Sequence, residues 1–217
     1  LKNRLMKILF SIINLLLVAF IMNAQTSILD KEEVFGTWTT SKSPYIIEGE
    51  AIVPEGKTLV IQPGVEVKFK TGEERDYTID GVVNKSFNLG FLRVNGTLKA
   101  EGKKKKLIKF TRFGGTGFWG NISFNSRSKE NILKYCWIDA SYFIRGVIKG
   151  TGDNATGAVS FFNSTGRIEN CLFIDNGWTA LNCKEGSNPV FTNNTVVGNQ
   201  YAIECNTGSS PEIINTI

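Results

Sequence analysis

The strongest constraint on this chain is a repeat of 22 residues in its C-terminal part. The segment "ALNCKEGSNPVF" (180–191) is followed by "AIECNTGSSPEI" (202–213), which keeps the Ala, Cys, Gly, Ser and Pro positions and changes the charged ones. A third copy lies upstream, because Ala158, Ala180 and Ala202 follow one another at the same interval. Self-similarity at a short fixed period is typical of architectures in which each copy is one structural unit that packs on the next.

Apolar and polar residues alternate within each copy, as in Leu181–Asn182–Cys183 and Ile203–Glu204–Cys205. A period of two indicates β-strands with one buried face. Gly, Asn, Ser and Pro separate these short segments, so no helix fits between them. We therefore expect parallel coils in which equivalent strands stack about 4.8 Å apart. Leu181 should then lie over Ile203 in a shared core.

Asparagine recurs at the ends of the expected strands, at Asn170, Asn193 and Asn215 and again at Asn176 and Asn199. Asn tolerates left-handed backbone and bonds to nearby backbone, so it suits the bend between two strands. An amide stacked on its counterpart both donates and accepts along the axis. The pattern therefore predicts bends at these positions and ladders of asparagine side chains.

Shorter strands of the same kind extend the series backwards to about Tyr45, so residues 45–217 are expected to form the coils and residues 25–44 a lead-in or cap. "ILKYCWIDAS" is an earlier version of "RIENCLFIDN", with Cys136 in the place of Cys171 and an insertion expected at 145–157. Residues 71–90 interrupt the series as a second protruding loop. The chain stops within a turn, at "PEIINTI", so we expect it to continue into the remainder of a longer polypeptide.

The N-terminal segment, residues 1–24, has the pattern of a secretory signal peptide. Lys2, Arg4 and Lys7 precede an apolar run from Ile8 to Ile21, and cleavage is expected after Ala24. The run is shorter than the roughly 20 residues that a membrane-spanning helix needs. The mature chain is thus expected to be secreted, extracellular or on the cell surface, without a membrane span.

Three phrases carry a family resemblance: "YIIEGEAIVPEGKTLVIQPGVEVKF", "LRVNGTLKAEG" followed by "IKFT", and "WGNISF". With the Asn-terminated coils, they resemble secreted bacterial right-handed parallel β-helix proteins of the pectate-lyase-like fold. The resemblance implies an all-β, right-handed single-stranded parallel β-helix with coils of about 22 residues. It does not select a function, since this fold carries lyases, hydrolases, adhesins and non-catalytic surface proteins.

Catalytic residues are poorly indicated. The resemblance implies an acidic calcium cluster with a basic residue for a lyase, or several close aspartates for a hydrolase. The outward columns predicted from the repeat hold a single acid each, as in Ser160–Asn182–Glu204, and the chain contains no histidine. Asp139 and Asp175 are the weak catalytic candidates, with Asp153 as a third partner. No cofactor or metal site is predicted, except that a lyase could require Ca²⁺.

Aromatic residues give the clearest binding hypothesis. Trp178 and Tyr201 each follow a repeated Asn by two residues, so they should share one corner of adjacent coils. Together with the outward residues Asn182 and Glu204 they are the candidate ligand-binding residues. Flat rings on a groove rim can stack on sugars, although rings that cap the core are the alternative. The sequence favours a non-catalytic module that binds polysaccharide or cell-surface glycan, or a surface or adhesin scaffold. A polysaccharide lyase or glycoside hydrolase is the alternative.

The cysteines and a lysine run complete the pattern. Cys183 and Cys205 should occupy one inward position of consecutive coils, with Cβ atoms near 4.8 Å rather than the roughly 3.8 Å of a relaxed disulfide. Buried thiols are therefore expected, and the cysteine spacing fits no zinc site. The run from Lys103 to Lys106 is expected to be a solvated turn. No aromatic residue interleaves it, so nucleic acid is not a predicted partner.

Overall fold

The computed structural model of this chain describes residues 25–72, 74–79, 82–87, 89–142, 155–206 and 208–217. The expected signal peptide, residues 1–24, lies outside the described residues, as does most of the expected insertion at 145–157. Among the described residues, no helix combines the length and the hydropathy that crossing a membrane would require.

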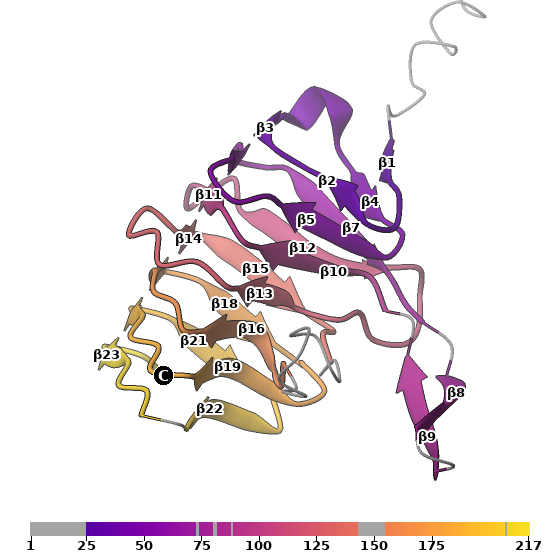
Figure 1. The fold of residues 1–217 in the computed structure, drawn as a ribbon. Helices are drawn as coiled ribbons and strands as arrows, with labels where there is room; N and C mark the ends of the chain where they lie inside the picture. Colours follow the sequence, from indigo (N-terminus) through magenta and orange to yellow (C-terminus); the bar gives the residue numbers. More distant parts are fainter. Residues whose placement is uncertain (1–24, 73, 80–81, 88, 143–154, 207) are drawn as a thin grey trace, which may run out of the picture.

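The chain winds as a stack of coils, and each coil gives one strand in turn to three sheets, which we call A, B and C (Figure 1). Every neighbouring pair in these sheets is parallel. Sheet A contains β1 (Thr26–Ile28), β4 (Tyr45–Ile47), β7 (Glu66–Lys70), β12 (Ile108–Phe113), β15 (Cys136–Asp139), β18 (Leu172–Ile174) and β21 (Thr195–Val197). Sheet B contains β2 (Glu32–Glu33), β5 (Glu50–Val53), β10 (Phe91–Val94), β13 (Ile122–Phe124), β16 (Gly157–Phe162), β19 (Thr179–Lys184) and β22 (Tyr201–Cys205). Sheet C contains β3 (Gly36–Trp38), β6 (Thr58–Ile61), β11 (Thr97–Glu101), β14 (Ile132–Lys134), β17 (Arg167–Glu169), β20 (Val190–Thr192) and β23 (Glu212–Ile214).

The register confirms the repeat. Leu181 pairs with Ile203, and Cys183 pairs with Cys205. In sheet C, Phe191 pairs with Ile168 on one side and with Ile213 on the other. Equivalent positions of consecutive coils are therefore direct neighbours, and this is the feature on which the whole architecture depends.

The core fills the space inside the coils with stacked apolar side chains. Rings lie on rings, with centroids 4.0 Å apart for Phe69 and Trp119 and 4.7 Å apart for Phe124 and Phe161. All four side chains are buried. Burying one large apolar side chain contributes about 1.5–3 kcal/mol, so the repeated inward positions supply the main stabilisation of the fold. Ile213, in contrast, is 48% exposed, because its strand β23 is the last of sheet C.

The repeated asparagines make the bends in the way predicted. Asn170, Asn193 and Asn215 have left-handed backbone, with φ of 55°, 55° and 45°. The amide ladder forms elsewhere, at Asn176 and Asn199, where Nδ2 of Asn176 donates to Oδ1 of Asn199 over 2.7 Å. Asn170, Asn193 and Asn215 thus form bends, whereas Asn176 and Asn199 form the ladder.

Two segments contain strands that the sequence analysis did not assign to them. Residues 25–44, predicted as a lead-in or cap, already form the first coil, because β1, β2 and β3 pair with β4, β5 and β6. They also contain a short 3₁₀ helix, η1 (Thr40–Lys42). Residues 71–90, predicted as a protruding loop, contain an antiparallel hairpin of β8 (Glu74–Ile79) and β9 (Val82–Phe87). The hairpin projects away from the stack in Figure 1.

The cysteines are free thiols, as predicted. Cys136 and Cys171 also stack, since Trp137 pairs with Leu172 and the backbone N–H of Cys136 lies 3.4 Å from Sγ of Cys171. The prediction of burial is correct for Cys183 and wrong for Cys205, which is exposed. Cys205 lies on β22, the last strand of sheet B, so no further strand of the described chain covers its side chain.

Candidate functional site

The candidate site lies where the chain passes from sheet A to sheet B, which we call the A–B corner. The hairpin β8–β9 is inserted there between β7 and β10, and residues 140–156 connect β15 to β16 at the same place two coils later. Later crossings are short: residues 175–178 between β18 and β19, and residues 198–200 between β21 and β22. The A–B corner thus carries the longest connections between strands.

Four aromatic side chains, which we call the aromatic row, follow this corner along the stack. Phe118 stacks on Tyr142, with centroids 5.4 Å apart and planes 28° apart. Trp178 makes edge contacts with Tyr142 at 6.4 Å and with Tyr201 at 5.6 Å. Phe118 is 40% and Tyr201 51% exposed, while the two central rings are half-buried. The predicted neighbours Trp178 and Tyr201 are therefore the last two members of a longer row.

The outer face of sheet B beside the row carries the predicted column of Ser160, Asn182 and Glu204, in register. Asn182 is fully buried, although an outward position was expected to be exposed. Among the described residues its Oδ1 atom has no hydrogen-bond partner, and its Nδ2 lies 3.4 Å from the backbone oxygen of Glu204. The Glu204 carboxylate is half-buried and accepts a bond of 2.8 Å from Thr156 Oγ1. Asn182 is thus inaccessible to a ligand in this conformation.

Gly157 explains how the chain comes so close to that column. A Cβ atom at Gly157 would lie 2.7 Å from the backbone nitrogen of Asn182 and 2.9 Å from its Cβ. The N–H of Gly157 also lies 3.1 Å from Oγ of Ser160. The start of β16 therefore packs against the polar column, which helps to bury it.

The two catalytic candidates lie in different surroundings. Asp139 is half-buried on the outer face of sheet A, where Thr111 Oγ1 donates to its Oδ1 over 2.5 Å and Trp137 Nε1 to its Oδ2 over 2.6 Å. Asp175 is exposed at the A–B corner, in left-handed backbone with φ of 50°. Asp139 pairs with Ile174, so the two acids are one coil and one residue apart. Asp153 lies outside the described residues.

A pocket of about 370 Å³ adjoins Asp139. Strands β7, β12 and β15 supply its walls, which carry the cations Lys68, Lys109 and Arg112 and a second carboxylate, Glu66. Glu66 pairs with Lys68 at 3.4 Å and with Lys109 at 3.3 Å. Trp137 forms part of the same wall. Within the described part of the chain, no group of three or more His, Cys, Asp or Glu side chains is arranged to hold a metal ion. The pocket can therefore offer two carboxylates, an indole and several cations to a ligand.

Sequence reasoning missed Phe118, Tyr142 and Trp137. The sequence contained a signal for Tyr142, namely the interval of 35 residues that separates Cys136 from Cys171. The same interval separates Ser141 from Asn176, and Ser141 N donates to Asn176 Oδ1. Applied to Tyr142, that interval leads to Gly177, next to Trp178. Phe118 lies in a segment of irregular length, so no repeat interval leads to it.

The three parallel sheets, the stacked core and the corner bends define a right-handed parallel β-helix protein. The model of the right-handed β-helix region family matches residues 88–217, and the chain belongs to this family. Neither the curated proteins nor the solved structures give a match to the chain.

Proposed function

We propose that this chain is a secreted or cell-surface β-helix module that binds polysaccharide at the A–B corner without catalysing its cleavage. The observation that carries the proposal is the aromatic row, with Tyr142, Trp178 and Tyr201 at the same corner of consecutive coils. Aromatic rings contribute large contact area at interfaces and keep a polar edge in water. Rings in a line along the stack suit an extended chain of sugars better than a compact ligand.

The geometry of the acids supports the non-catalytic part of the proposal. Hydrolysis of a glycosidic bond uses two carboxyl groups about 5–9.5 Å apart on either side of the bond. Both oxygens of Asp139 accept hydrogen bonds from Thr111 and Trp137, and Asp175 is offset from Asp139 by one coil and one residue, on left-handed backbone. We therefore assign the A–B corner to binding.

Retention of the chain on polysaccharide gels tests this proposal. The double variant Trp178→Ala/Tyr201→Ala should lose at least about tenfold in affinity, because central aromatic residues dominate such interfaces. Phe35→Ala is the matched control, since Phe35 is 54% exposed and lies outside the row. Binding to no polysaccharide, or equal binding by the double variant and the wild type, would overturn the proposal. The latter result is the one expected of a purely structural adhesin scaffold.

The proposed secretion depends on residues 1–24, and it is tested separately. Expression of the full chain in a bacterial host should give a mature protein that begins near Gln25 outside the cytoplasm, as N-terminal sequencing would show. A chain that stays in the cytoplasm with residues 1–24 attached contradicts the secretory assignment and leaves the binding assay to be interpreted on its own.

A polysaccharide lyase or glycoside hydrolase is the second candidate, and the pocket beside Asp139 favours it. Asp139 and Glu66 both line this pocket together with three cationic side chains, a combination that could act on an acidic sugar chain. The test is incubation with pectin and alginate, with and without Ca²⁺, and measurement of unsaturated and reducing ends. Product formation that disappears in Asp139→Asn or Asp175→Asn would establish the enzyme and reject the non-catalytic assignment.

A further inference from the structure

The lysine run forms a turn at a second corner, where the chain passes from sheet C to sheet A. The backbone N–H of Lys103 donates to the oxygen of Lys106 over 3.0 Å, and the reverse bond is 2.8 Å. All four lysines are exposed, as predicted for a solvated turn. Later coils cross this corner with a tight left-handed bend at Tyr135, Asn170 or Asn193. The lysine turn therefore enlarges a corner that is elsewhere kept short.

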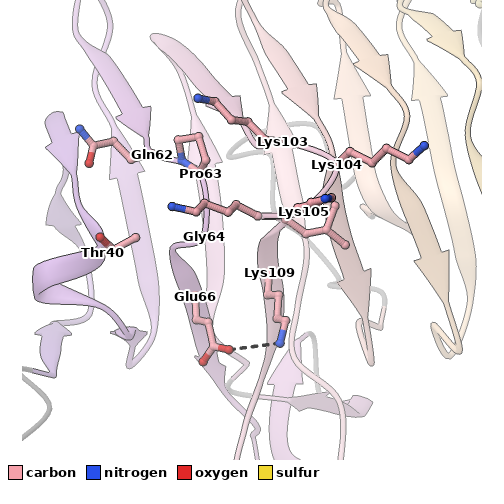
Figure 2. Close-up of a pocket in the computed structure, with 11 residues that line it drawn as sticks. Thr40, Gln62, Pro63, Gly64, Glu66, Lys103, Lys104, Lys105 and Lys109 are labelled. Carbon is pink, nitrogen blue, oxygen red and sulfur yellow. Dashed lines mark hydrogen bonds and ion pairs between the residues drawn. The ribbon is translucent and has the colours of Figure 1, made fainter.

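A pocket of about 940 Å³ lies beside this turn. Its walls come from crossings of the same corner: Thr40 from the first coil, then Gln62, Pro63 and Gly64 from the second, then the lysine turn. Figure 2 shows Lys103 extending towards Gln62 and Pro63, whereas Lys104 extends in the opposite direction over the following coils. The positive charge is therefore spread along the stack rather than gathered at one point.

The excess of positive charge around this pocket favours anions. Within the described part of the chain, Lys103, Lys104, Lys105 and Lys106 form no ion pair. The one carboxylate that lines the pocket belongs to Glu66, which is held by Lys68 at 3.4 Å and by Lys109 at 3.3 Å (Figure 2). Four cations thus face solvent without a compensating acid, and they attract counter-ions.

Polar side chains and a glycine backbone also line the pocket. Gly64 has a φ of 88°, and the nearest atoms to a Cβ there would be Cγ2 of Thr40 at 3.6 Å and Cβ of Lys106 at 3.9 Å. The floor between Thr40 and the lysine turn is therefore open backbone. The amide of Gln62 and the hydroxyl of Thr40 are exposed and can bond hydroxyl groups.

We propose that this pocket binds an anionic polysaccharide, one that carries carboxylate or sulfate groups. Lysine is a flexible point charge, which suits anionic groups at varied positions along a polymer better than one fixed bidentate ligand. No aromatic side chain of the described residues lines the pocket, so it lacks the stacking platform of single-stranded nucleic acid sites. The exposed large apolar side chains of the described residues, such as Leu29 and Phe35, line other surfaces, so a membrane is not favoured.

Affinity measurements on the full chain with dextran sulfate, polygalacturonate and neutral dextran test the proposal. Both anionic polymers should bind, and dextran should not. The variant Lys103→Ser/Lys105→Ser should weaken binding roughly 25-fold, at about fivefold for each lysine near an anionic surface. It should also reduce the slope of log affinity against log salt by about 1 to 2, because fewer counter-ions are released.

The matched control is Lys57→Ser/Lys129→Ser, which removes the same charge from exposed positions between strands of sheets B and C. It should change the affinity by less than about threefold, since these lysines do not line the pocket and lie at a different corner, where salt screens their charge. Equal losses of affinity in the two double variants would show that binding depends on net charge alone, and they would overturn the proposal. So would tighter binding to duplex DNA or to anionic vesicles than to either anionic polysaccharide.

The two polysaccharide proposals fail independently. Trp178→Ala/Tyr201→Ala should leave binding to dextran sulfate unchanged, because the aromatic row and the lysine turn lie at different corners. Loss of dextran sulfate binding in that variant would place the anionic ligand at the aromatic row and reject the pocket, while loss on the polysaccharide gels alone bears only on the proposed function.

Discussion

Gly177 and Tyr142 are so close that a Cβ atom at position 177 would lie 2.6 Å from Cδ2 of the tyrosine ring. The same atom would lie 2.9 Å from Cε1 of Phe118. The N–H of Gly177 donates to the backbone oxygen of Ser141 over 2.8 Å, which fixes the glycine one coil above the tyrosine. The lack of a side chain at this position is therefore what allows the first two rings of the aromatic row to lie over the next coil.

Gly177→Ala should displace these rings and lower the free energy of unfolding by about 1–3 kcal/mol, the usual cost of overpacking. Urea denaturation measures the loss, and near-ultraviolet circular dichroism reports the altered ring packing. Gly115→Ala is the control, because a Cβ at Gly115 has no atom within 4 Å. Identical spectra and stabilities for both variants would contradict the close packing described for Gly177.

Asn176→Ala should be among the most destabilising polar substitutions in the chain. The side chain is buried, its Oδ1 accepts from Ser141 N at 3.0 Å and Ser141 Oγ at 2.8 Å, and its Nδ2 donates to Ile138 O at 3.2 Å. Removing the amide leaves these groups unpaired inside the protein, at a cost of about 2–3 kcal/mol. Asn206→Ala, at an exposed position, should change the free energy of unfolding by less than about 0.5 kcal/mol.

Asn193 provides a test of the bends themselves, because its side chain is exposed and its backbone is left-handed with φ of 55°. Asn193→Val should cost about 1–2 kcal/mol, since a side chain with a branched Cβ is strained in this conformation. Asn193→Gly should be close to neutral, because glycine adopts the same conformation without strain. Chemical denaturation of the two variants gives the comparison. A valine variant as stable as the glycine variant would show that this bend does not depend on the left-handed residue.

The thiols should differ sharply in reactivity. Burial raises the pKa of the Cys136 and Cys183 thiols, and burial also raises that of Cys205, which is nevertheless exposed. At pH 8 iodoacetamide should label only Cys205 in the native protein, more slowly than free cysteine and faster as the pH rises, because the thiolate is the reactive form. Peptide mass spectrometry after timed quenching identifies the sites. Native labelling of Cys183 at the rate of Cys205 would be incompatible with its burial.

The same two buried thiols also link stability to pH. Their pKa values are raised in the folded chain, so above the ordinary thiol value of 9.0 the native state keeps protons that the unfolded chain releases. The stabilising contribution is complete below that pH and decreases as the pH rises further. In Cys136→Ala/Cys183→Ala the fall in the free energy of unfolding above pH 9 should be smaller than in the wild type, as denaturation at several pH values would measure.

The repeat predicted the coils, their register and the bends because these depend on interactions between equivalent residues, which a fixed interval brings together. Leu181 with Ile203 and Trp178 with Tyr201 are examples. Exposure was less predictable, since it depends on what covers a face. Asn182 has an outward position in the alternating pattern, but a neighbouring segment buries it. Cys205 has an inward position, but it is exposed because it lies on an edge strand. The lysine pocket was not predicted because the interval from Gln62 to the lysine turn is 41 residues, well beyond the 22-residue repeat that separates Thr40 from Gln62.

The placement of the longest insertions at the A–B corner has a consequence for how such a chain can change. The hairpin β8–β9 enters and leaves at neighbouring points of one margin, and β7 and β10 keep their partners on both sides of it. Segments of new length can therefore be grafted there without shifting the alignment of any coil. Insertions and deletions at this corner can therefore accumulate during evolution while the stacked coils keep their register.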